Sequence, residues 1–194
     1  MTENICTITI DGKSVELPVV EGTTGDRAID ISRLRELTGV TTLDPSLANT
    51  ASCRSAISWI DGENGRLLYR GIPIETLAEN KVSFVETAML LITGRLPTPA
   101  ERNDFSELLA RNSALHRNMD LHFNAFPPNS HPMAIMSAMI NAMSTHDRPK
   151  ITDEDSAIRN SAKLMSRVRT IAAASYKASV GEPAIYCLLY TSDA

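Results

Sequence analysis

Helix start and stop signals recur from residue 72 to residue 180, and no other feature of the sequence restricts the fold as strongly. Ser83 precedes Glu86 by three residues, which is the spacing of a capping box, and Gly94 stands where a helix-ending glycine belongs. The segment Thr98–Glu101 repeats the start signal, with a proline at its second position. We therefore expect helices over residues 73–78, 83–94, 98–111, 115–126, 132–146 and 152–180, the last opened by Thr152 with Asp155 and broken near Arg169.

Strand signals occupy the chain before this helical part. Residues 7–17 alternate polar and apolar side chains around Asp11-Gly12, a pattern that predicts a hairpin. Residues 57–69 place apolar runs on both sides of a turn-rich DGENG sequence, which predicts a second hairpin. Between the two hairpins we expect a short helix over residues 26–34 and a loop over residues 38–55.

These signals predict a mainly α fold. A small N-terminal β-rich segment (residues 1–70) is expected to precede the first helices of a larger helical domain (residues 71–186). Hydrophobic residues make up 43% of the chain and charged residues 22%, which is typical of a globular protein and not of a disordered one.

The charge balance limits the partners. Nineteen basic and twenty-three acidic side chains give a net charge of −4, so the chain has no overall attraction to nucleic acid or to an anionic membrane. The longest uncharged stretch, residues 123–146, contains three prolines and cannot span a membrane. The N-terminal residues lack the apolar run of a secretory signal. We expect a soluble, cytoplasmic protein.

Motifs for metal, nucleotide or nucleophile chemistry are missing from the sequence. The three cysteines, Cys6, Cys53 and Cys187, are far apart and form no zinc-binding pattern, so we interpret them as reduced thiols. There is no Gly-rich dinucleotide loop, no Walker-type loop and no GxSxG elbow. We interpret the four histidines, His116, His122, His131 and His146, as structural or surface residues.

Two side-chain stripes leave alternatives open. Arg159, Lys163 and Arg167 are spaced by four and lie on one helix face, which is either a solvated face or an anion site such as one for nucleotide phosphates. A second, apolar stripe also follows helical spacing; it contains Met133, Met136, Met139, Ile140 and Met143. It indicates a helix that is buried in a core or against another subunit, and the alternative is an adaptable binding surface.

Four longer motifs remain, TASCRSAISWIDGENGRLLYRGIPIETLAE (50–79), LLITGRLPT (90–98), SHPMAIM (130–136) and SYKASVGEP (175–183). Together they closely resemble the bacterial members of the citrate synthase family. The first hairpin, followed by EGTTGDRAIDI, resembles the β-rich extension of the Gram-negative (type II) form. The resemblance covers about residues 5 to 186, whereas CLLYTSDA (187–194) fits neither the family nor a domain end and resembles a non-native tail.

This resemblance implies an acyltransferase of the citric acid cycle, which condenses acetyl-CoA with oxaloacetate and water to give citrate and CoA. The family uses an Asp and two His for catalysis and further His and Arg for substrate, all later in its chain than this sequence reaches. The resemblance therefore implies an inactive N-terminal fragment with no catalytic, cofactor-binding or metal-binding residue. A 2-methylcitrate synthase, which uses propionyl-CoA, and a non-catalytic helical dimerisation piece are the alternatives.

The resemblance also implies self-association as a homodimer or hexamer, with helices at 132–145 and 152–180 in the dimer interface. Gram-negative members are inhibited by NADH at an allosteric site formed partly by these helices. The residues that match it here are Arg111, Asn112, Thr145, Lys163 and Arg167. Asn112 and Thr145 stand where a His and a Tyr are expected, so we expect any NADH response to be weaker or absent.

Overall fold

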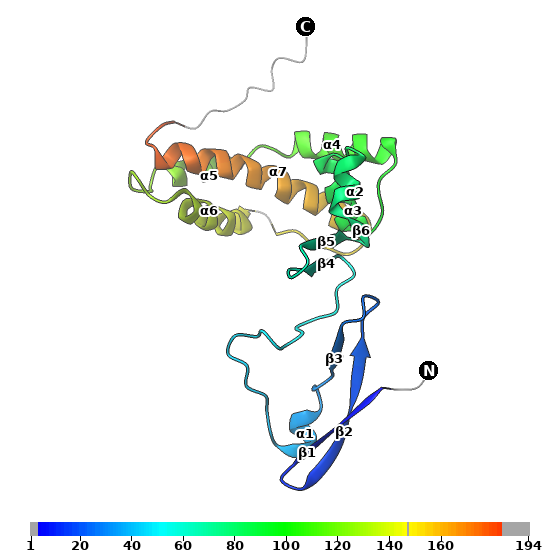
Figure 1. Cartoon of the computed structure of the whole chain (residues 1–194). Coiled ribbons are helices and arrows are strands. Elements are labelled where there is room, and N and C mark those ends of the chain that lie inside the picture. Colours follow the sequence, from blue (N-terminus) through cyan, green and yellow to red (C-terminus); the bar gives the residue numbers. More distant parts are fainter. Residues whose placement is uncertain (1–3, 147, 184–194) are drawn as a thin grey trace. The chain divides into compact units, whose positions relative to one another are not determined.

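The computed structural model describes residues 4–146 and 148–183. The chain forms two compact units, Met1–Ala56 and Ile57–Ala194, which we describe separately (Figure 1). The second predicted hairpin is therefore grouped with the helices, whereas the sequence-based boundary at residue 70 separated it from them. The predicted tail at 187–194 lies outside the described residues.

The first unit is a three-stranded antiparallel sheet with one short helix. Its strands follow the order β1 (Ile5–Ile10), β2 (Lys13–Glu21) and β3 (Arg27–Ile29), and the helix is α1 (Leu34–Thr38). The first predicted hairpin is confirmed, because Ile10 pairs with Lys13 across Asp11-Gly12, where φ is 51° and 77°. Val15, Leu17 and Leu34 form the small core of this unit.

The helix expected over residues 26–34 is wrong. Arg27–Ile29 is a strand that pairs with Val19–Glu21, and α1 begins only at Leu34. The Asp30 backbone N–H also donates to the Pro18 carbonyl at 2.8 Å, which extends this pairing. Cross-strand hydrogen bonds therefore override a local pattern that suits either a helix or a strand.

The second unit begins with the other predicted hairpin, which is confirmed. The strands β4 (Ser58–Asp61) and β5 (Arg66–Tyr69) pair antiparallel, and β6 (Ile72–Pro73) adds a short third strand. Six helices follow in the described part of this unit. They are α2 (Ile74–Glu79), α3 (Phe84–Thr93), α4 (Pro99–Arg111), α5 (Arg117–Phe123), α6 (Pro132–His146) and α7 (Glu154–Ser179).

Local capping chemistry sets the starts of α3 and α4 as the sequence predicts. Ser83 and Glu86 form a capping box at α3, and Thr98 and Glu101 form one at α4. Gly94 ends α3 with a φ of 85°, a conformation that favours glycine.

Two expectations for α7 are wrong. Its N-cap is Asp153 and not Thr152, because the Asp153 carboxylate accepts the Ser156 N–H at 2.7 Å and the Ser156 hydroxyl accepts the Asp153 N–H at 3.1 Å. The break expected near Arg169 does not occur, and α7 is continuous. No glycine or proline interrupts it, and buried small and apolar residues continue along one face past this point.

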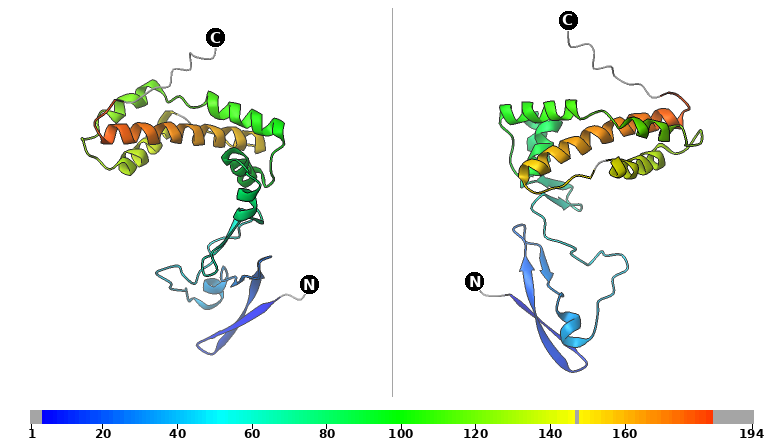
Figure 2. Two further views of the ribbon diagram at one scale, coloured as in Figure 1. Left: turned by 45° about the horizontal axis from the view of Figure 1, so that its top comes forward. Right: turned by 180° about the vertical axis from the view of Figure 1, so that it is seen from behind.

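Helix α7 takes part in both apolar clusters of the second unit. One cluster joins α5, α6 and α7 through Met119, Phe123, Ile135, Met139 and Ile171. The other joins α3, α4 and α7 through Met89, Phe105 and Ala162. The views in Figure 2 show α4 and α6 lying along α7. The methionine stripe on α6 therefore serves this chain's own core, although Met133 remains 61% exposed.

No helix in the described part of the chain is both long and apolar enough to cross a membrane.

Candidate functional site

Helix α7 is fixed against the C-terminal end of α4 by hydroxyl groups. The Ser166 hydroxyl donates to the Leu109 carbonyl, and the Thr170 hydroxyl donates to the Ser113 carbonyl at 2.7 Å. The carbonyls at a helix end have no partner within the helix, so these bonds satisfy groups that would otherwise be costly to bury. One face of α7 is therefore held in a defined position by α4.

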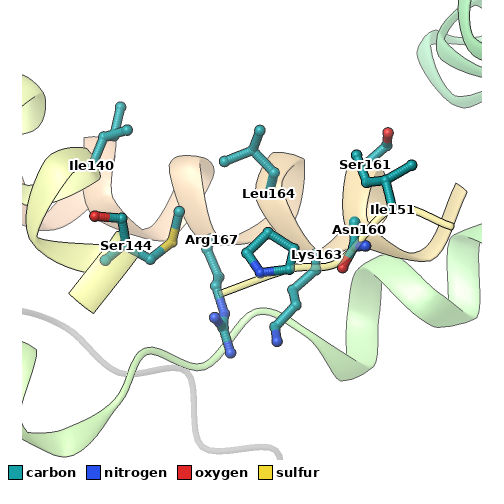
Figure 3. Close-up of a pocket in the computed structure, with 10 residues that line it drawn as sticks. Ile140, Ser144, Ile151, Asn160, Ser161, Lys163, Leu164 and Arg167 are labelled. Atoms are coloured by element: carbon teal, nitrogen blue, oxygen red, sulfur yellow. The ribbon is translucent and has the colours of Figure 1, made fainter. Parts of the chain in front are cut away.

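A groove of about 320 Å³ lies along another part of α7 (Figure 3). It is bounded by α6, by the loop at residues 149–151 and by α7 itself. Ile140 and Met143 of α6, Ile151 of the loop and Leu164 of α7 supply apolar surface. The pocket is thus lined mainly by side chains that favour an apolar or amphipathic occupant.

Two cationic residues of α7 also line this groove. Lys163 and Arg167 are one helical turn apart, and Figure 3 shows their charged ends extending to the same side of α7, away from Leu164. Both side chains are half-buried. Positive charge beside an apolar bed suits a ligand that carries both an anionic group and an apolar or aromatic body.

The other three predicted nucleotide-site residues do not line the groove. Arg111, the last residue of α4, forms an ion pair with Glu107, one turn earlier. The Asn112 side chain donates to a carbonyl of α4 at 2.7 Å, and the Thr145 hydroxyl donates to a carbonyl of α6 at 2.7 Å. The structure therefore brings together two of the five predicted residues, while these three bond within or next to their own helices.

The four histidines occupy helix ends. His116 precedes α5, His122 lies in its last turn, His131 precedes α6, and His146 is the last residue of α6. The rings of His116 and His146 are stacked, with centroids 4.4 Å apart and planes inclined by 15°. In the described residues, no group of three or more His, Cys, Asp or Glu side chains is arranged to hold a metal ion. Cys6 and Cys53 are free thiols.

Carboxyl groups with lowered pKa values lie at helix caps and turns. Arg95 and Thr98 donate hydrogen bonds to Glu101 and lower its pKa from 4.5 to about 2. Hydrogen bonds from Ser83 lower the pKa of Glu86, and those from Ser156 and Thr152 lower the pKa of Asp153. The hydrogen bonds that cause these three pKa shifts stabilise helix starts. None of the three carboxyl groups lines the groove.

A family model described as "Citrate synthase, C-terminal domain" matches residues 46–192. The chain belongs to the citrate synthase family. It is 37% identical over 187 residues to "Citrate synthase 1" of Mycobacterium tuberculosis, in both the CDC 1551 / Oshkosh and the H37Rv strains. That alignment covers 95% of this chain and 43% of the relative, so the chain spans less than half the length of these citrate synthases.

Solved citrate synthase structures share the fold. The enzyme from Thermotoga maritima is 32% identical, with a TM-score of 0.61 over 75% of this chain and 37% of that chain. The enzyme from Thermoplasma acidophilum, solved as a ternary complex with carboxymethyl coenzyme A and oxaloacetate, is 20% identical. Its TM-score is 0.70 over 75% of this chain and 38% of that chain.

The sequence indicated Lys163 and Arg167 as one helix face but not the rest of the groove. Asn160 and Leu164 lie at helical spacing from them, so periodicity could have indicated this wall. The contribution of the loop at 149–151 has no such signal, because it depends on how the chain turns between α6 and α7. The stack of His116 on His146 was also missed, since these residues are far apart in sequence.

Proposed function

We propose that this chain is the N-terminal part of a citrate synthase of the Gram-negative type. The complete cytoplasmic enzyme would condense acetyl-CoA with oxaloacetate and water to give citrate and CoA. The family match over residues 46–192 carries this proposal. The resemblance of the first hairpin and of EGTTGDRAIDI to the Gram-negative form supports the subtype. The ligands of the Thermoplasma acidophilum structure support the substrate class.

In this proposal, the chain forms part of the structural scaffold of the enzyme, and the catalytic groups lie elsewhere in the complete protein. The condensation requires a carboxylate base to remove a methyl proton from the thioester and neutral donors to stabilise the developing enolate oxygen. It also requires cationic groups to hold the two carboxylates of oxaloacetate. The relatives extend well beyond the region that this chain covers, which leaves room for those groups elsewhere.

A thiol-release assay on the complete enzyme tests the proposed substrates. Citrate synthase activity would give faster CoA release with acetyl-CoA than with propionyl-CoA when oxaloacetate is present. A clear preference for propionyl-CoA would instead identify a 2-methylcitrate synthase. Absence of release with both thioesters would reject the enzymatic function.

We further propose that any NADH site on this chain is weak. Lys163 and Arg167 provide positive charge at the groove, whereas Arg111 is paired with Glu107. Asn112 and Thr145 bond to backbone carbonyls and offer no aromatic surface for a nicotinamide or adenine ring. The side chains thus favour anion attraction without strong stacking.

Titration of the complete enzyme with NADH tests this second proposal. We expect little inhibition, and we expect Lys163→Gln and Arg167→Gln to change it little. Strong inhibition that weakens with salt and disappears in both variants would refute the proposal. Arg159→Gln is the matched control, because Arg159 lies on the same helix but does not line the groove.

We also propose self-association through α6 and α7. Met133, Ile151 and Leu164 are 61%, 69% and 48% exposed, which leaves apolar surface on and between these helices. A molar mass of the complete enzyme equal to a dimer or hexamer would support this assembly, whereas a monomer at micromolar concentration would exclude it.

A further inference from the structure

Strand β1 lies at one edge of the sheet in the first unit, because the strand order is β1-β2-β3 (Figure 1). Ile10 pairs with Lys13 across a two-residue turn, and the Val19 backbone N–H donates to the Asn4 carbonyl at 2.7 Å. Hydrogen-bonded residues alternate along an antiparallel pair, so the even-numbered residues of β1 bond to β2. The odd-numbered residues turn their backbone N–H and C=O groups away from β2; they are Ile5, Thr7 and Thr9.

These outward backbone groups have no hydrogen-bond partner in the described part of the chain. The neighbouring strand agrees with this assignment. Pro18, which pairs with Ile5, turns its carbonyl toward β3, where the carbonyl accepts the Asp30 N–H at 2.8 Å. The side chains of Ile5, Thr7 and Thr9 are also exposed. The edge of β1 is therefore open to water or to a further strand.

The two edges of this sheet differ in their protection against such pairing. Strand β3 is three residues long and begins with Arg27, and short length and charge are common devices that prevent unwanted strand addition. Strand β1 is six residues long and contains no charged residue, glycine or proline. Apart from Cys6, it consists of isoleucine and threonine, whose branched side chains suit a strand. Thus β1 is the edge that can receive another strand.

A second copy of β1 suits this edge better than the other described strands do. Strands β2 and β5 already have a strand on each side. Strand β4 is four residues long and carries Asp61, and β3 and β6 are shorter still. Among the described strands, β1 therefore offers the longest uncharged edge.

Antiparallel pairing about a two-fold axis at Thr7 uses the outward groups of all three odd-numbered residues. Thr7 then faces Thr7 of the second copy, and Cys6 faces Ile8 at a position without backbone hydrogen bonds. Glu16 is the β2 neighbour of Thr7, so the two copies of Glu16 lie three strand spacings, or about 14 Å, apart. This separation exceeds the screening length of about 8 Å at physiological ionic strength. The pairing therefore places no like charges directly opposite each other at its centre.

We propose that the free edge of β1 binds β1 of a second copy of this chain, antiparallel and centred on Thr7, so that two sheets become one. Backbone hydrogen bonds supply the attraction, and the alternation of side chains between the two faces fixes the register. The contact lies in the first unit, whereas α6 and α7 belong to the second, so association through those helices is tested separately.

A disulfide trap tests the register. All chains carry Cys53→Ser and Cys187→Ser; one chain keeps Cys6, and the other combines Cys6→Ser with Ile8→Cys. Residues at a non-hydrogen-bonded position have Cα atoms about 4.5 Å apart, which a disulfide can bridge. Ile10→Cys replaces Ile8→Cys in the matched control, because both isoleucines pack against the same small core. In the control the Cα atoms are about 8 Å apart, which is too far.

After mild oxidation of each mixture, we expect about tenfold more linked dimer with Ile8→Cys than with Ile10→Cys. Equal linkage in the two mixtures, or no linkage in either, would overturn the proposal. Linkage that forms only when a different protein is added would also overturn it, because the edge would then belong to that partner.

Charge at the centre of the strand gives a second test, which leaves the small core untouched. Thr7→Lys in both chains places like charges directly opposite each other, so linkage should fall about tenfold. Thr7→Val keeps an uncharged, branched side chain and should change the yield by less than about twofold. With the far-ultraviolet circular dichroism unchanged in both variants, undiminished linkage in Thr7→Lys would refute the proposal. An equal fall in Thr7→Val would do the same.

Discussion

Glu101 links three interactions at the start of α4. Its carboxylate accepts the Thr98 N–H at 2.8 Å and the Thr98 hydroxyl at 3.0 Å, and it pairs with Arg95 at 2.6 Å. Because these contacts favour the ionised form, the pKa of Glu101 falls to about 2. The side chain thus stabilises the helix start only while it carries its charge.

Acid should weaken α4 through this residue. The pKa of Glu101 is lower in the folded state than its ordinary 4.5, so its contribution to stability is present above pH 4.5 and is lost as the pH falls toward about 2. We expect Glu101→Gln to reduce the pH dependence of the unfolding free energy in that window, measured by urea titration. Glu107→Gln, which removes an exposed carboxylate and its pair with Arg111 on the same helix, is the matched control.

Two buried serines of α7 should respond differently to the same substitution. Ser166 and Ser175 are 2% and 1% exposed, but only Ser166 has a hydrogen-bond partner for its hydroxyl among the described residues. Ser166→Ala leaves the Leu109 carbonyl unsatisfied and should lower the unfolding free energy by about 1 to 3 kcal/mol. Ser175→Ala should be neutral or stabilising, and an equal loss in both variants would contradict this explanation.

At the scale of elements, local chemistry makes much of the helical part predictable from the sequence. The capping boxes at Ser83 and Thr98 depend on residues within one turn, so the spacing of the side chains is enough to predict them. Strand β3 was missed because its hydrogen bonds come from β2, and the break in α7 was wrongly expected because burial along that helix is a tertiary property. For the same reason, the sequence indicated Lys163 and Arg167 but not the groove beside them.

Helix α7 should couple the two apolar clusters. Phe105 is 1% exposed in the α3–α4–α7 cluster, and Phe105→Ala should lower the unfolding free energy by about 3 to 5 kcal/mol. Because α7 also completes the other cluster, hydrogen-exchange protection of α6 should fall as well. Unchanged protection in α6 would show that the clusters are independent. Phe84→Ala is the control, since Phe84 is 74% exposed.

At the scale of the whole molecule, the chain combines a small sheet unit with a helical unit of the citrate synthase family. It covers 43% of the length of its Mycobacterium tuberculosis relatives. The helices build two apolar clusters and a largely apolar groove that carries Lys163 and Arg167. The carboxyl groups of Glu101, Glu86 and Asp153, whose pKa values are lowered, serve helix caps. This distribution fits our proposal that the chain provides scaffold for an active site completed elsewhere.

The most direct test is to measure CoA thiol release by the purified 194-residue chain with acetyl-CoA and oxaloacetate, together with its far-ultraviolet circular dichroism. The account predicts a helical spectrum and no release above the uncatalysed background. Release that increases in proportion to the concentration of this chain would contradict it, because the chain would then carry a complete catalytic site.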